Sequence, residues 1–138
     1  MGTWAVDAFG NDYAQDWAED LAQVSNLEAV ESTLDVVLQA GSGELAAPFA
    51  AEALVAVEVL ARLQGKGGPQ TDDSRAVDEW VAARKAKARV RTDLAQKALQ
   101  VLDKVLAPGS ELRELWEDSE HYAEWSASVA DLRGRLQA

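Results

Sequence analysis

The sequence predicts an all-α domain, a compact bundle of six or seven short helices around a central helix rich in Ala, Val and Leu. Two observations predict this fold class. Apolar residues recur at spacings of three and four through most of the chain, as in amphipathic helices. No segment shows sustained alternation of apolar and polar residues, the pattern of a half-buried strand. We therefore expect residues 1–138 to form a single helical domain with short loops between neighbouring helices.

The first helix is predicted to begin at about Asp12, and the two dozen residues around this start anchor the predicted fold. Asn11 or Asp12 can cap its N-terminus, and Gln15 stands three residues after Asp12, which allows a capping-box exchange. An aromatic and apolar stripe follows at spacings of four, four and three residues. Its members are Tyr13, Trp17, Leu21 and Val24.

A second helix is predicted between a capping box and a glycine. Ser25 with Glu28 three residues later has the capping-box pattern, and an apolar stripe follows at helical spacing. Gly41 ends this stripe, as glycine often does just beyond a helix. Residues 41–43 then read as a loop before the third helix.

The third helix, residues 49–63, is the predicted centre of the bundle. Pro48 fits its first turn, where a missing N–H costs no hydrogen bond. The helix is apolar on nearly every side, which favours a buried position. It is too short and too charged to cross a membrane, and we expect Glu52 and Glu58 to mark its narrow exposed edge.

A glycine-rich linker at residues 65–69 opens the second half of the chain. It is not a phosphate-binding loop, because Lys66 is followed by glycine and the segment follows a helix instead of a strand. A helix capped by Asp72, Asp73 or Ser74 should run into the basic segment 84–91. This segment is interpreted as a solvated face or internal counter-charge, with an anion or acidic-partner site as the alternative.

Three further helices complete the prediction. We expect a break near Val90 and a new helix over residues 92–106, because Thr92 and Asp93 resemble a fresh cap. Ser110 should cap a short helix that follows Pro108 and Gly109. The last helix, residues 122–136, carries its apolar residues on one face.

The net charge of -11 is concentrated in the first half. Eleven Asp and Glu residues precede Arg62, the first basic residue, whereas the remaining 13 acids are balanced by 13 bases. Direct nucleic-acid binding is therefore not expected, because phosphate neutralisation needs a basic face. A basic protein surface is an allowed partner, and plain solubility is the simpler interpretation.

The acidic first helix carries the candidate site residues. A partner-binding surface would involve Asp12, Asp16, Glu19 and Asp20. Alternatively, Asp12, Asp16 and Asp20 form a ladder at every fourth residue that offers oxygens to calcium or magnesium. Such cations prefer ligands converging from several directions, whereas one helical stripe supplies them from one side, and capping with solubility is the simpler interpretation.

The inventory for catalysis is thin, and we predict no catalytic residue and no cofactor. His121, the single histidine, lies near a helix junction and is interpreted as a capping or surface residue. Without cysteine the chain has no disulfide or thiolate chemistry. No signal peptide or membrane-spanning run is evident, so a cytoplasmic location is expected. The five tryptophans are most simply core anchors.

Several segments together resemble a known family. They are Gly2-Thr3-Trp4, Phe9 to Asp12, Asp16-Trp17, the Ala-rich stretch 50–61, Ser110 to Trp116, and Trp125 with residues 131–136. The chain resembles the bacterial family called domain of unknown function 4259, whose opening usually has glycine where Ala5 and Ala8 stand here. The resemblance implies a small bacterial protein without an established activity, and it brings no site residues.

Three functional hypotheses follow. The leading one is a non-enzymatic interaction module whose acidic surface binds a basic protein, as an immunity protein or antitoxin does. The second is a small-molecule or divalent-metal-binding helical protein, with hydrolysis by Asp12, Asp16 and His121 as one form of it. The third is self-association through the aromatic faces of the terminal helices.

Overall fold

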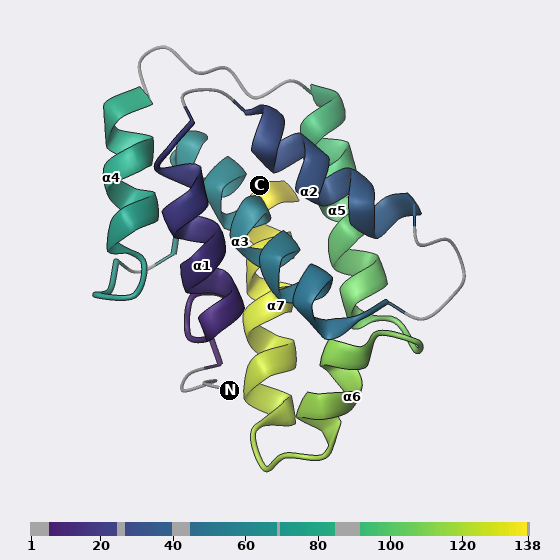
Figure 1. Ribbon diagram of the computed structural model, residues 1–138. Coiled ribbons are helices and arrows are strands. Elements are labelled where there is room, and N and C mark those ends of the chain that lie inside the picture. Colours follow the sequence, from purple (N-terminus) through teal and green to yellow (C-terminus); the bar gives the residue numbers. More distant parts are fainter. Residues whose placement is uncertain (1–5, 25–26, 40–44, 69, 85–91, 138) are drawn as a thin grey trace.

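The all-α prediction is confirmed, with seven helices in the described part of the chain (Figure 1). The structure, a computed structural model, describes residues 6–24, 27–39, 45–68, 70–84 and 92–137. The helices are α1 (Asp12–Leu21), α2 (Glu28–Gln39), α3 (Ala47–Leu63), α4 (Arg75–Arg84), α5 (Thr92–Leu106), α6 (Glu111–Glu117) and α7 (Tyr122–Gln137). The predictions for Ser25, for residues 41–43 and for a break near Val90 concern residues outside the described ranges.

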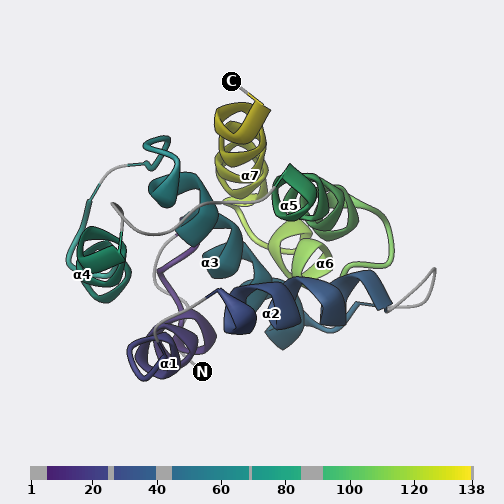
Figure 2. The same ribbon diagram turned by 90° about the horizontal axis from the view of Figure 1, so that it is seen from above.

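Helix α3 is the centre of the bundle, as its composition predicts. It contacts every other described helix, and in Figure 2 it lies between α1 and α4 on one side and α5 and α7 on the other. From Ala50 to Leu63 every side chain is buried except that of Glu52, which is half-buried. Pro48 occupies the first turn, as expected. Small Ala and Val side chains let the surrounding helices approach this axis from all sides.

Two predicted N-caps are confirmed. The Asn11 side chain accepts a hydrogen bond of 2.8 Å from the backbone N–H of Ala14 and so caps α1. The Ser110 hydroxyl likewise accepts one from the N–H of Arg113 at the start of α6. Each cap satisfies one of the N–H groups that a helix leaves without an internal partner.

The predicted capping box of Asp12 and Gln15 is wrong. Because Asn11 is the cap, the third helical position is Ala14, and the Gln15 amide makes other bonds. Its Nε2 donates to the carbonyl oxygens of Phe9 (2.8 Å) and Asp73 (2.9 Å). Gln15 therefore ties the loop before α1 to the segment before α4.

The tryptophans in the described ranges anchor helices to one another, as expected. Trp17, Trp80 and Trp125 are buried. The Trp17 indole N–H donates to Thr33 of α2, and that of Trp80 donates to the carbonyl of Val24 after α1. The tryptophans of α1, α4 and α7 are thus already packed inside the molecule.

Candidate functional site

The four predicted partner-binding carboxylates are all exposed on α1. These are Asp12, Asp16, Glu19 and Asp20. Asp16, Glu19 and Asp20 form no ion pair with any residue of the described ranges. Asp12 lies in the first turn, where a carboxylate suits the positive end of the helix dipole.

Two acids of α2 share a basic partner from the second half of the chain. Lys97 of α5 lies 2.9 Å from Glu31 and 2.9 Å from Asp35, both on α2. Hydrogen bonds to Glu31 and then to Asp35 raise the pKa of Lys97, so it stays charged. The negative charge of α2 is therefore partly compensated within the bundle, whereas Asp16, Glu19 and Asp20 of α1 have no ion-pair partner in the described ranges.

The negative field of α1 also reaches α3. Glu52 is half-buried, and burial together with the nearby Asp20 carboxylate raises its pKa above the ordinary value. Removal from water disfavours the charged form, and a like charge adds to this effect. The face shared by α1 and Glu52 thus holds negative charge at an energetic cost.

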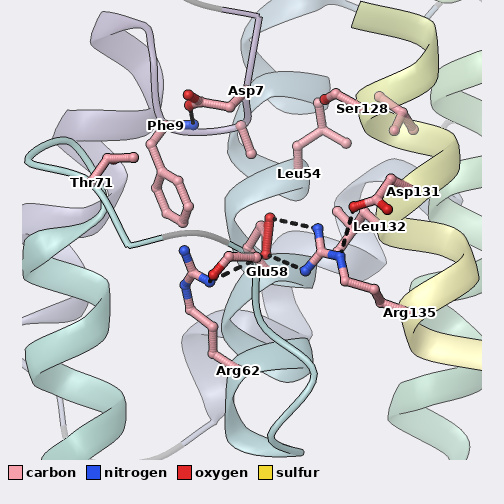
Figure 3. Close-up of a pocket in the computed structure, with 13 residues that line it drawn as sticks. Asp7, Phe9, Leu54, Glu58, Arg62, Thr71, Ser128, Asp131, Leu132 and Arg135 are labelled. Carbon is pink, nitrogen blue, oxygen red and sulfur yellow. Dashed lines mark hydrogen bonds and ion pairs between the residues drawn. The ribbon is translucent and has the colours of Figure 1, made fainter. Parts of the chain in front are cut away.

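Glu58 contradicts the prediction that it marks an exposed edge of α3. Its side chain is buried and accepts hydrogen bonds of 3.2 Å from both Nη1 and Nη2 of Arg135 on α7 (Figure 3). Arg62, one turn later on α3, lies 3.8 Å from the same carboxylate. A buried carboxylate is stable only when it is paired, and these two arginines supply the charge.

Arg62 is held on every side. Its Nε lies 3.0 Å from Asp78 of α4, an ion pair whose angle falls outside that of a hydrogen bond. Its guanidinium carbon lies 5.1 Å above the centre of the Phe9 ring, within cation–π range. Nη1 donates to the carbonyl of Gly68, and a Cβ at Gly67 would lie 2.5 Å from Arg62 Cγ. The glycine-rich linker therefore wraps a buried arginine.

A charged pocket of about 160 Å³ lies between α3, α7 and the loop before α1 (Figure 3), and its lining includes Glu58, Arg62 and Arg135. Arg135 also donates to Asp131 and to the carbonyl of Lys66. The two arginines face three carboxylates, those of Glu58, Asp78 and Asp131, so the cluster carries a net negative charge. An anion would have to displace these carboxylates from the arginines. The ion pairs therefore hold α3, α4 and α7 together and do not form an anion-binding site.

A second hollow, the apolar groove, has a volume of about 320 Å³ and lies on the other side of the loop before α1. Asp7, Ala8 and Leu54 line both hollows. The apolar and aromatic lining comes from α1, α3, α6 and α7 and includes Tyr13, Pro48, Leu112, Leu115, Trp116 and Trp125. Asn11 and Glu111 supply polar groups.

The structure does not gather the residues of the metal and hydrolytic hypotheses. His121 is exposed in the turn between α6 and α7, and its Nδ1 lies 3.1 Å from Glu124. Within the described ranges no three His, Asp or Glu side chains are grouped so as to hold a metal ion. Asp12, Asp16 and Asp20 are among the residues to which that finding applies.

Sequence reasoning missed the charged pocket. One signal was present: Glu58 and Arg62 stand four residues apart in a helix whose only other charged residue is Glu52. A charged pair on a helix expected at the centre of a bundle indicates buried partners. The partner Arg135 was not recognisable, because it lies far away in the sequence.

The comparisons with known proteins identify the family. The model of a family described as "Domain of unknown function (DUF4259)" matches residues 2–128, nearly the whole chain. The chain belongs to this family. No curated protein and no solved structure matches the chain. None of the described helices of this DUF4259 chain combines the length and apolar character needed to span a membrane.

Proposed function

We propose that this DUF4259 chain is a non-enzymatic protein-interaction module that binds a basic protein through the exposed carboxylates of α1. The observation that supports this most is the contrast in pairing. Asp16, Glu19 and Asp20 have no ion-pair partner in the described ranges, whereas Glu31 and Asp35 of α2 and the buried Glu58 do. Together with Asp12 they form the proposed contact surface.

A basic partner would reduce the repulsion between the carboxylates of α1 and that of Glu52. The raised pKa of Glu52, caused by burial and then by Asp20, indicates that like charges crowd this face. Lys and Arg side chains of a partner would offset that field, and complementary potentials accelerate encounter. Immunity proteins and antitoxins that mask a positively charged site on a toxin use the same physics.

The test is a pull-down from a lysate of the source organism at low and high salt. We expect a basic protein to be captured at low ionic strength and released at high ionic strength, because salt screens exposed charges. A variant in which the four α1 acids are replaced by Asn or Gln should capture at least about tenfold less, a change of roughly 1.4 kcal/mol.

A matched control separates the α1 surface from net charge. It neutralises four exposed acids on other segments, namely Asp72, Glu79, Asp93 and Asp103. Both variants change the net charge by the same amount, although the control also breaks the exposed ion pairs of Asp72 with Arg75 and of Asp103 with Arg133. Equal loss of capture in the two variants, or no captured protein at either salt concentration, would contradict the proposal.

The other hypotheses receive less support. His121 pairs with Glu124 and does not join a metal-binding group with the α1 acids in the described ranges. Self-association through the aromatic faces of the terminal helices would need side chains such as Trp17 and Trp125, which are buried within one chain. Binding of a basic protein is therefore the hypothesis that the described contacts support best.

A further inference from the structure

We infer that the apolar groove seats a large apolar side chain from a basic amphipathic segment of a protein partner. The inference rests on the proposed function, because it assigns the groove to the same basic partner. It adds a second contact, at the α6 end of the molecule. Three features of the groove support it: its apolar lining, its fixed walls and the charge around it.

The first feature is apolar surface that the fold leaves uncovered. Leu115 of α6 lines the groove and is 57% exposed. Trp116 stacks on the buried Trp125 with ring centroids 6.2 Å apart. Aromatic and aliphatic groups of this kind form the centres of protein interfaces.

The second feature is that the groove walls are fixed by hydrogen bonds between distant segments. A carboxylate oxygen of Glu111 accepts a bond of 2.7 Å from the N–H of Ala47. The N–H of Glu111 donates to the carbonyl of Leu45 at 2.8 Å, and the N–H of Leu45 donates to the carbonyl of Gly109. Because these bonds join α6 to the start of α3, little ordering is needed before a side chain binds.

The third feature is negative charge around α6 and the turn that follows. Exposed carboxylates in this region belong to Glu114, Glu117, Asp118, Glu120 and Glu124. The nearby Arg113 turns inward, where its Nη1 donates to the carbonyl of Leu106 at 2.7 Å and its Nε lies 3.4 Å from Glu117. The field at the groove therefore favours a segment that carries Lys or Arg.

The groove also reaches the N-terminal end of α1, where the proposed contact surface begins. Asn11 and Tyr13 line it, and the exposed Asp12 stands between them in the sequence. A partner segment seated against α6 would therefore pass the N-terminal end of α1. The apolar anchor would fix its position, while carboxylates on both sides would select for bases.

The probe for this inference is a synthetic helical peptide of about 15 residues with Leu at positions i, i+3, i+4 and i+7 and Lys elsewhere. A control peptide has the same composition, with its leucines spread around the helix. Neither contains tryptophan, so a change in the tryptophan fluorescence of the full chain, to which Trp116 and Trp125 contribute, reports binding. We expect the amphipathic peptide to bind at least about tenfold more tightly, as burial of one large apolar side chain would give.

Two variants separate seating in the groove from attraction by charge. Leu115→Glu makes the groove more acidic and less apolar, and Val36→Glu makes the same charge change at a residue of α2 that is 45% exposed. Attraction by charge alone predicts equal or tighter binding in both variants. Seating in the groove predicts binding about tenfold weaker in Leu115→Glu only. Circular dichroism checks that both variants fold.

Each outcome decides the inference. Preference for the amphipathic peptide, lost in Leu115→Glu and kept in Val36→Glu, supports it. Equal binding of the two peptides, weakened by neutralising the α1 acids, overturns the groove but leaves the proposed function standing. If neither peptide binds at low salt, the groove inference is overturned and the charge attraction behind the proposed function is contradicted as well.

Discussion

Helices α1 and α3 use carboxylates in opposite ways. Glu58 of α3 is buried against Arg62 and Arg135, whereas Asp16 and Asp20 of α1 face water without an ion pair to any described residue. Both helices belong to the acidic first half of the chain. The difference teaches that charge counted along a sequence is not charge on a surface, because distant bases cancel part of it inside the fold.

The largest effect on stability is expected from removing the buried carboxylate of α3. Glu58→Gln leaves Arg135 without its bidentate partner, and we expect a loss of about 3 kcal/mol in the free energy of unfolding, measured with urea at pH 7. Asp131→Asn is the matched control, since this carboxylate binds the same arginine but is 67% exposed. The control should cost less than about 1 kcal/mol. Similar losses in both variants would contradict the assignment of Glu58 as the buried partner.

A smaller loss is expected at the next carboxylate of the same network. Asp78 accepts a hydrogen bond of 2.6 Å from Ser74 and lies 3.0 Å from Arg62. Asp78→Asn removes the charge while Glu58 still faces Arg62, so we expect a loss of about 1.5 kcal/mol in urea unfolding. Asp72→Asn, which breaks the exposed pair with Arg75, should change stability little. An Asp78 variant as stable as this control would show that α4 is not held by the network.

Local patterns were sufficient to predict the helices. The spacing of apolar residues gave the faces of α1, α5 and α7, and the caps at Asn11 and Ser110 followed from residue type. The apolar composition of α3 was enough to place it at the centre, because a helix without a polar face must be surrounded. These predictions depend on residues within a few turns of one another.

The two hollows were not predictable, because their bonds join distant segments. In the charged pocket Glu58 meets Arg135 across 77 residues, and in the apolar groove Glu111 meets Ala47 across 64. Helical periodicity assigns a charged residue to the exposed face and carries no information on a partner far along the chain. Glu58 was therefore predicted on the wrong side of its helix.

Glu52 of α3 is neither buried in an ion pair like Glu58 nor exposed like Asp16. Removing its charge should therefore raise the stability of the protein, whereas removing that of Glu58 should lower it. Burial and then Asp20 raise its pKa, so the charged form lowers stability once the pH exceeds that raised pKa. Below the ordinary pKa of glutamate the group is protonated in both the folded and unfolded states, and the penalty is absent. Glu52→Gln should therefore be more stable than the original chain at pH 7, by about 0.5 kcal/mol at most because the group is partly hydrated.

The measurement is thermal unfolding of both proteins between pH 3 and 8, a range of about five units that spans the ordinary carboxyl pKa. The advantage of Glu52→Gln should shrink as the pH falls and vanish at the acidic end. Asp20→Asn should give part of the same gain, since Asp20 is the smaller of the two causes. A variant that is less stable than the original at pH 7 would show that Glu52 has a stabilising partner.

The smallest effect is expected on the exposed side of the comparison. Asp16→Asn combined with Glu19→Gln removes two carboxylates that make no ion pair within the described ranges, so stability at physiological salt should change by less than about 0.5 kcal/mol. At low salt the variant should be slightly more stable than the original chain, because repulsion among the α1 carboxylates of the original chain is then less screened. Thermal unfolding at two salt concentrations measures both quantities. A clear loss of stability would mean that these carboxylates stabilise the fold as Glu58 does. The difference in pairing between α1 and α3, on which the proposed partner surface rests, would then be contradicted.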